Sequence, residues 1–571
     1  MTEKLLARAG AVRVAGVVAA ALGLVTVLLP WAYGKTALDN MTYFFGPSFL
    51  QLCYAILLLV ALVALAAKWF RGRLGRFAKA VAWADTAKAA GLGAAGYALA
   101  CLVAIAVQNG GLVMIEPGGW AAFGLALVTG GAALVLPGSA KPTLGKLKSP
   151  PWVQILAIAA AMAVVLFAAA YELNRADIED FLVFGCFAVA VVVVGRAAGL
   201  FGWLSLAAAN NRRVLSLAAF AVAFAFPFTQ NGSDANMSVA NQVLIFAATA
   251  MGLNIVVGLV GLLDMGYIAF LGAGAFTAAV LSKSAFATLS VDLPFPVTVL
   301  ISGVVASLLG LLIGTPTLRV SGDYLAIVTL AFGEIFRITM NNLDGVDGPN
   351  ITNGSNGVPA IPNLDFFGFN LGQVHHFLGV DLGRQSNYYW LLLVVIAVVI
   401  VVFSNLAHSR IGRGWVAIRE DELAAEAMGV NTFALKLLAF AGGAFLAGMA
   451  GSVKAYRDTA VSPDQFVFLE SAFLLAAVVL GGMGTIGGVL IGATLLKLLP
   501  EKLRFFEDYR LLLFGALMVL MMRFRPEGIV ADERRQLEFH DADEELAEEV
   551  EEDLVSHHSL LNPETDRGAV A

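Results

Sequence analysis

The residues best placed to do chemistry lie in a charged segment, residues 408–431, between two apolar stretches. Good helix formers fill positions 420–428, and Gly429 is a residue that commonly ends a helix. The acidic residues cluster in the first turn, where they interact favourably with the positive end of the helix dipole. A short amphipathic helix of this kind suits binding in a groove of another protein; an ordinary solvated connector is the alternative. The candidate contact residues are Arg419, Glu420, Asp421, Glu422, Ala424, Ala425, Glu426 and Gly429.

The sequence contains no motif of a familiar catalytic site. It has no Walker A sequence, no Gly-x-Ser-x-Gly and no His-Glu-x-x-His. Its three cysteines, Cys53, Cys101 and Cys186, show neither CxxC nor Cys/His spacing. We therefore expect a chain that is not an enzyme, does not hydrolyse ATP itself, and holds no cofactor or metal.

Polar residues inside apolar stretches are the next candidates, because burying them in lipid is costly. Glu334 and Arg337 lie three positions apart, so they share one helix face and can pair. They either line a substrate pathway or fix helix packing. Asn254 and Thr329 fit interhelical hydrogen bonds better than ligand contacts. The candidate pathway residues are Asn254, Tyr267, Thr329, Glu334 and Arg337.

The elements that carry these residues must be membrane spans. Of 571 residues, 59% are hydrophobic and only 14% are charged, and the mean hydropathy is +0.81. A soluble domain has about a quarter of its residues charged. The apolar residues also form blocks of roughly 17–25, the length of a transmembrane helix. The sequence therefore predicts an all-α integral membrane protein with about 14 transmembrane helices.

Loop charges predict the orientation of these spans, because basic residues concentrate on the cytoplasmic side. The loop at residues 68–88 holds six basic residues, whereas the long polar loop at 341–387 holds four aspartates and one arginine. We expect the first loop inside and the second outside. Both termini are then cytoplasmic.

One apolar stretch, residues 472–495, is interrupted by glycines that disfavour a continuous helix. We expect a broken, re-entrant element there, because irregular backbone is tolerated at membrane depth where protein covers it. The alternative is an ordinary helix that packs closely through small residues. The candidate hinge residues are Gly481, Gly482, Gly484, Gly487 and Gly488.

The chain divides into three predicted regions. Residues 1–213 form an N-terminal extension of about six spans, and residues 214–530 form a second membrane region. Residues 531–571 hold 14 acidic and three basic residues within a net charge of −6 for the whole chain. Such a tail is typically disordered, and the alternative is a docking segment for a basic partner.

Six motifs in the second region resemble one known family. They are GLNIVVGL at 252–259, DMGYIAF at 264–270, LRVSGDYLAIVTLAFGEI at 318–335, IREDE at 418–422, VLGGMGTIGG at 479–488 and FRPEG at 524–528. In this order they resemble the LivM family of branched-chain amino acid permeases, and residues 408–431 resemble the loop on which an ATPase subunit docks. The resemblance covers about 214–530, and it does not extend to residues 1–210.

The resemblance implies a permease subunit of an ATP-driven importer in a bacterial inner membrane. It implies a branched-chain amino acid as substrate, with urea or short amides as the alternative within the superfamily. The implied partners are a second permease of the LivH type, two ATPase subunits that use ATP and Mg²⁺, and a periplasmic substrate-binding protein. Homodimerisation is the less favoured alternative to pairing with LivH.

Two other classes of protein remain to be weighed. An ion-coupled secondary transporter would show inverted repeats, and none is visible by eye. A polytopic membrane enzyme would need a cluster of His, Asp or Cys at one membrane face, and the sequence has no such cluster.

Overall fold

The computed structural model describes residues 2–34, 38, 41, 48–70, 80–138, 149–175, 177–291, 293–318, 323–346, 349–366, 368–377, 379–502 and scattered positions between 509 and 530. The chain divides into two compact units. The first comprises Met1–Gln242, Asp365–Leu393 and Leu498–Arg510, and the second Val243–Leu364, Val394–Lys497 and Leu511–Ala571. The acidic region at 531–571 lies outside the described residues.

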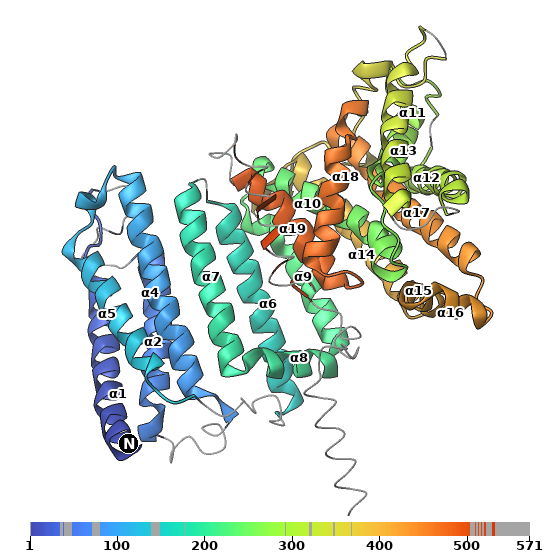
Figure 1. Cartoon of the computed structure of the whole chain (residues 1–571). Coiled ribbons are helices and arrows are strands. Elements are labelled where there is room, and N and C mark those ends of the chain that lie inside the picture. The colour runs from blue at the N-terminus through green and yellow to red at the C-terminus, as the bar shows by residue number, and fades with distance from the viewer. Residues whose placement is uncertain are drawn as a thin grey trace, which may run out of the picture. The chain divides into compact units, whose positions relative to one another are not determined.

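Four helices of the first unit pack side by side, as Figure 1 shows at the blue end of the chain. They are α1 (Thr2–Val25), α2 (Phe49–Phe70), α4 (Trp83–Gln108) and α5 (Pro117–Leu134), with short 3-10 turns η1 (Thr26–Leu28) and η2 (Leu112–Met114). Buried tyrosines tie these helices together: the Tyr54 hydroxyl donates to the Ala122 carbonyl at 2.6 Å, and the Tyr97 hydroxyl donates to the Leu50 carbonyl at 2.8 Å.

The rest of the first unit includes four further helices. They are α6 (Pro151–Leu173), α7 (Ile178–Ala198), α8 (Leu200–Asn210) and α9 (Arg212–Thr229). The sequence predicts one long span from about 181 to 207, but this stretch is two helices. Gly199 has a φ of +82°, and this left-handed conformation ends α7 before α8 begins. Helix α6 packs against both α8 and α9.

The second unit holds most helices of the predicted permease domain, whereas α9 lies in the first unit. They are α10 (Asp234–Asn254), the π-helix η4 (Ile255–Leu259), α11 (Ile268–Leu281), α12 (Phe295–Thr317), α13 (Asp323–Asn342), α14 (Arg384–Ala407), α15 (Arg410–Glu420), α16 (Glu422–Ala427), α17 (Thr432–Asp458), α18 (Phe468–Gly481) and α19 (Ile486–Lys502), with 3-10 turns η5 (Gly354–Asn356) and η6 (Pro463–Gln465). Helices α10, α14 and α19 also contribute residues to the first unit.

Helix α17 is the centre of packing in the second unit, where α11 and α12 both lie along it. Small residues allow this close approach. A Cβ atom at Gly274 would lie 2.2 Å from the Gly448 carbonyl oxygen, and one at Gly451 would lie 2.1 Å from the Leu271 carbonyl oxygen. Glycine at these positions therefore sets the distance between α11 and α17.

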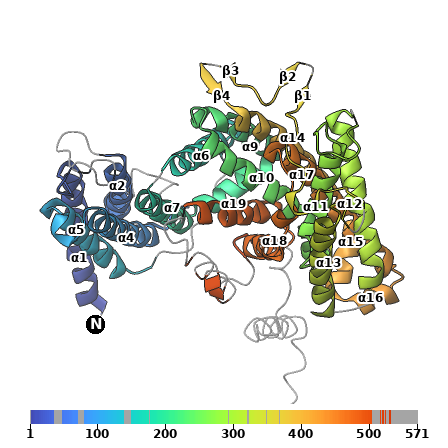
Figure 2. The same cartoon turned by 90° about the horizontal axis from the view of Figure 1, so that it is seen from above.

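Two short antiparallel hairpins are the sheet structure of the described residues. Strand β1 (Asp365–Phe366) pairs with β2 (Phe369–Asn370), and β3 (His375–Phe377) pairs with β4 (Val380–Leu382). Figure 2 shows the two hairpins next to each other. They belong to the polar loop at 341–387, which the sequence analysis treats as a single outside loop.

The helix content confirms the predicted class. Within the described ranges, 13 helices are long and apolar enough to cross a membrane, close to the 14 that the sequence predicts. Helix α11 is apolar but shorter, with 14 residues. The chain is an all-α membrane protein.

The predicted break near 472–495 is present. Helix α18 ends at Gly481, and the chain resumes as α19 at Ile486. Gly482 and Gly484 adopt φ values of +124° and +82°, which disfavour any residue with a side chain. Helix α19 then folds back along α18, since a Cβ at Gly492 would lie 2.1 Å from the Ala477 carbonyl oxygen.

Candidate functional site

The charged segment is two helices rather than the single helix expected over residues 420–428. Helix α15 ends at Glu420, and Asp421 (φ −154°, ψ 108°) leaves the helical conformation. The Asp421 side chain then accepts a hydrogen bond from the Ala424 N–H at 2.9 Å, so Asp421 is the N-cap of α16. By capping α16, Asp421 ends the preceding helix, although good helix formers surround it. Gly429 ends α16 with a φ of +83°, as the sequence predicts.

Helix α16 presents most of its side chains to solvent. The apolar side chains of Leu423 and Met428 are 79% and 85% exposed. Asp421, Ala424 and Glu426 are exposed as well. These exposed side chains of the six-residue helix form one small surface, here called the docking face (Leu423, Ala424, Glu426 and Met428).

Ala425 does not belong to this docking face. It is only 5% exposed and is therefore covered by the chain itself. Glu422 also faces α17, because its carboxylate pairs with the ammonium group of Lys436 on that helix. The sequence groups Ala425 with the contact residues because the spacing alone does not tell which side of α16 meets α17.

Helix α15 holds the docking face in place through two anchors. Trp415 is 1% exposed, and its indole N–H donates to the Leu435 carbonyl at 2.8 Å. The Arg419 Nη1 donates to the Gly258 carbonyl at 2.7 Å, across to the π-helix η4. The segment is therefore fixed to the spans at both α17 and η4. Figure 1 shows α15 and α16 joined end to end beside α17.

A second polar group lies on α13. The Arg337 Nε donates to Glu334 Oε1 at 3.1 Å, as the three-residue spacing predicts. The Arg337 Nη1 also donates to Asp464 Oδ1 in η6 at 3.3 Å, a partner that the sequence analysis missed. The pair therefore joins α13 to the connection between α17 and α18. Asp464 is 127 positions away, and spacing rules within a helix cannot find such a partner.

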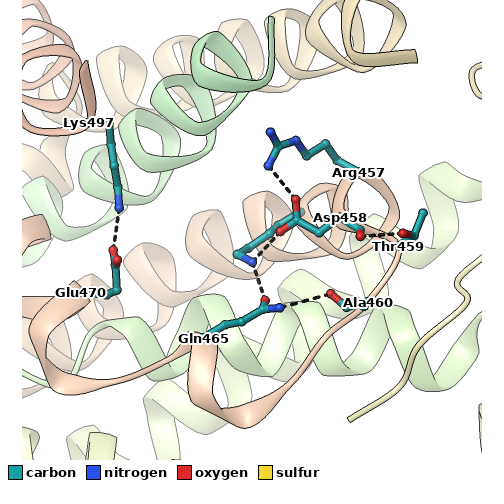
Figure 3. Close-up of polar contacts among 8 residues, drawn as sticks. Arg457, Asp458, Thr459, Ala460, Gln465, Glu470 and Lys497 are labelled. Atoms are coloured by element: carbon teal, nitrogen blue, oxygen red, sulfur yellow. Dashed lines mark hydrogen bonds and ion pairs between the residues drawn. The ribbon is translucent and has the colours of Figure 1, made fainter. Parts of the chain in front are cut away.

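The C-terminal end of α17 carries a second set of polar contacts, which Figure 3 shows. The Lys454 ammonium donates to Asp458 Oδ2 at 2.7 Å and to Gln465 Oε1 at 2.6 Å. Arg457, only 6% exposed, donates to Asp458 Oδ1 at 2.6 Å. The sequence analysis did not name these residues, although their spacing of i, i+3 and i+4 is a detectable signal. We call Glu334, Arg337, Asp464, Gln465, Lys454, Arg457 and Asp458 the ionic network.

The three remaining pathway candidates are buried between helices. The Thr329 hydroxyl accepts from the Met265 N–H at 3.0 Å and donates to the Ala326 carbonyl. The Asn254 Oδ1 accepts from the Gly484 N–H at 2.8 Å. The Tyr267 hydroxyl is buried and has no hydrogen-bond partner among the described residues. Thr329 and Asn254 thus join separate segments, one of the two roles that the sequence analysis weighed for them.

The glycine-rich break is held by named contacts. The N–H groups of Ile529 and Val530 donate to the carbonyls of Leu480 and Gly481 at 2.9 Å each. These carbonyls lie at the end of α18, where helical partners are lacking. At the open end of the α18–α19 hairpin, Lys497 Nζ and Glu470 Oε2 are 2.7 Å apart (Figure 3). The break is therefore a built feature with its exposed backbone groups satisfied.

These features define a polytopic all-α membrane protein with an exposed charged helix, α16, between two of its spans. The family described as "Branched-chain amino acid transport system / permease component" matches residues 235–522. The chain belongs to this family. The match begins after residues 1–213, the predicted N-terminal extension.

Individual relatives agree with this assignment. The "High-affinity branched-chain amino acid transport system permease protein LivM" of Salmonella typhimurium is 39% identical over 340 residues, which covers 57% of this chain and 77% of the relative. The LivM protein of Escherichia coli K12 matches to the same extent. The LivH permease of Escherichia coli K12 is 27% identical over 182 residues, covering 32% of this chain and 58% of LivH. No solved structure matches the chain.

Proposed function

We propose that the chain forms half of the translocation pathway of an ATP-driven importer for leucine, isoleucine and valine. The names of the 39% identical relatives support the substrate class. The observation that carries the proposal is the docking face, where Leu423 and Met428 stand exposed on a helix that is anchored to the spans. An exposed apolar pair rimmed by charges is typical of a protein interface. A separate ATPase subunit is its proposed occupant, and α15 and α16 together are here called the docking segment.

The ionic network has the chemistry that an amino acid requires. An amino acid is a zwitterion, so a pathway for it needs both positively and negatively charged groups. Arg337 and Glu334 provide both on one helix, and Asp464 and Lys454 extend the set to neighbouring segments. Intramembrane charged residues are costly and are typically retained at substrate pathways. We assign the network to the outer part of the pathway.

The geometry of α17 supports the proposed orientation. This helix begins near α16 and has 27 residues, so it is about 40 Å long and crosses a bilayer. With α16 on the cytoplasmic side of the inner membrane, the network residues Lys454 and Asp458 lie near the periplasmic side. The neighbouring segment agrees, because Val358 of the predicted outside loop pairs with Val461 just beyond α17. Both termini of the chain are cytoplasmic in this arrangement.

The remaining subunits follow from the same assignment. We assign the second half of the pathway to a permease of the LivH type, because the chain is similar to both LivM and LivH proteins. Two ATPase subunits supply ATP hydrolysis with Mg²⁺. A periplasmic binding protein delivers the substrate to the outside loop at 341–387.

The proposal is tested in proteoliposomes that contain the complete complex, with binding protein outside and ATP and Mg²⁺ inside. We expect accumulation of labelled leucine that stops when ATP is omitted or when this chain is left out. Parallel vesicles receive labelled urea or acetamide. Accumulation of these compounds without leucine would move the protein to the alternative substrate class. Leucine uptake driven by an ion gradient without ATP would contradict the importer assignment.

A further inference from the structure

Three segments that are far apart in the sequence meet at Gly258 of the π-helix η4. A Cβ atom there would lie 2.0 Å from Asn254 Oδ1 and 2.6 Å from the Gly484 nitrogen. The carbonyl of the same residue accepts the 2.7 Å hydrogen bond from Arg419. Gly258 therefore touches the end of α10, the break between α18 and α19, and the end of α15. We call this meeting point the junction.

The π-helix itself is an unusual element. A π-turn contains one residue more than an α-helical turn, and such turns are frequent at functional sites. Here the Val260 N–H bonds to the Ile255 carbonyl at 3.3 Å, and the Leu262 N–H bonds to the Val256 carbonyl at 3.0 Å. All residues of η4 are buried. The extra residue widens the helix beside the break.

Asn254 fixes the break from one side. Its Oδ1 accepts from the Gly484 N–H at 2.8 Å, and its Nδ2 lies 3.5 Å from the Thr485 carbonyl oxygen. Gly484 has a left-handed φ and sits outside both helices, so its N–H has no helical partner. The amide of Asn254 thus supplies the hydrogen bond that the interrupted backbone lacks. Gly258 leaves the space in which that amide lies.

Arg419 fixes the same point from the docking segment. It lies two positions before Asp421, the N-cap of α16. Its stem packs on Gly261, where a Cβ atom would lie 3.0 Å from Arg419 Cγ. A displacement of α16 therefore either carries η4 with it or breaks the bond between Arg419 and Gly258.

We infer that the junction transmits movement of the docking segment to the break between α18 and α19. Asn254 and Arg419 are its positioning residues, and neither is required to touch the substrate. This inference rests on the proposed function, because it assumes that an ATPase moves α16. It assigns Asn254 a role that differs from a pathway contact. Each link in the route is a contact of 3.5 Å or less between described residues.

The test uses the complete complex in proteoliposomes and compares Asn254→Ala, Arg419→Met and a matched control. Arg419→Met keeps an apolar stem on Gly261 but removes the guanidinium. The control is Thr315→Ala, because the Thr315 hydroxyl donates to the Leu311 carbonyl within its own helix, α12, at 2.7 Å. Three quantities are measured: ATPase subunits retained by the complex, the rate of ATP hydrolysis, and leucine accumulated per ATP hydrolysed.

We expect both junction variants to retain the ATPase subunits and to hydrolyse ATP, while leucine per ATP falls about tenfold. Thr315→Ala should leave all three quantities unchanged. Asn254→Asp keeps the acceptor for the Gly484 N–H and should restore most of the coupling. A purely structural role would instead lower all three quantities together. Unchanged leucine per ATP in either junction variant would overturn the inference.

The double variant gives an independent check. If both residues act through one junction, breaking the second link adds little once the first is broken. We expect the double variant to accumulate about as much leucine per ATP as the more impaired of the two single variants. If the losses of leucine per ATP in the two single variants multiply in the double variant, the two residues do not act through one junction. If Asn254→Ala fails to assemble, Arg419→Met carries the test alone. Absence of ATP-driven uptake in the wild-type complex would refute the proposed function instead.

Discussion

Ala425 and Leu423 lie two positions apart on α16, yet they face opposite environments. Ala425 is 5% exposed and Leu423 is 79% exposed. The sequence identifies the docking segment from its helix formers, its acids and Gly429. It does not reveal which side chain is covered, because that depends on where α16 lies against α17. The sequence likewise does not reveal Asp464 as the partner of Arg337, because that contact depends on how the segments pack.

We expect Ala425→Trp to destabilise the permease itself rather than only its interface. Overpacking a buried position costs about 1–3 kcal/mol. The thermal midpoint of the purified chain in detergent should fall, whereas Leu423→Trp at the exposed position should leave it unchanged. Equal midpoints for the two variants would show that Ala425 is not buried by its own chain.

Asp264 gives a prediction about pH. It is 1% exposed in the connection between η4 and α11, and its Oδ2 has no hydrogen-bond partner among the described residues. Burial raises the pKa of this carboxyl from 3.8 to about 7, against the opposing effect of the Gly266 N–H bond. In the folded state it stays protonated up to about pH 7, while in the unfolded state it ionises above about pH 4.

Folding stability therefore falls as the pH rises from about 4 to about 7 and then levels off. The loss is on the order of a few kcal/mol. Asp264→Asn removes the ionisation, so its unfolding midpoint in detergent should fall less between pH 5 and pH 8 than that of the wild type. Parallel pH profiles for the two proteins would mean that Asp264 keeps an ordinary pKa.

At the scale of elements, the helices and the break near 472–495 follow from apolar block lengths and glycine positions. The split of the docking segment at Asp421 and the end of α7 at Gly199 were missed. In both cases one local conformation overrides a run of helix formers. The sequence also does not predict which segment bonds to the carbonyls at the end of α18. The structure shows that this segment is residues 529–530.

The five glycines of the break are not equivalent, and α19 offers a matched pair. A Cβ atom at Gly488 would lie 2.5 Å from the Gly481 carbonyl oxygen, whereas one at Gly487 would meet nothing within 4 Å. We expect Gly488→Ala to destabilise the protein by about 1–3 kcal/mol. Gly487→Ala should be neutral or stabilising by up to about 1 kcal/mol, because alanine favours a helix. Denaturant unfolding in detergent distinguishes them, and equal losses would contradict the close approach of α18 and α19.

At the scale of the whole molecule, the extension is the part that the family does not explain. The family match begins at residue 235, and α6 of the extension packs against α9, the last helix before the match. Figure 1 shows both helices side by side. The Asn174 side chain also accepts a hydrogen bond from Asn236 at 2.8 Å. Composition predicts spans in the extension, and only the structure shows which of them support the permease helices.

We expect a chain that begins at Arg212 to transport leucine normally per assembled complex but to assemble in lower yield, since α9 loses its packing on α6. A chain that begins at Pro150 keeps α6 to α8 and should recover the yield. Uptake per complex and complex yield are measured separately. Assembled complexes of the shorter chain that transport nothing would show that the extension takes part in transport itself.

The account rests on an ATPase that binds the docking face, and ATP-driven leucine uptake by a Leu423→Asp/Met428→Asp double variant tests this most directly. The control is Leu112→Asp/Val113→Asp, which alters two exposed apolar residues of the extension. We predict that the docking-face variant keeps its wild-type unfolding midpoint but loses the ATPase subunits on purification, and that its leucine uptake falls at least about tenfold. The control should keep the ATPase subunits and the leucine uptake. ATP-driven uptake at the wild-type rate by the docking-face variant would contradict the account.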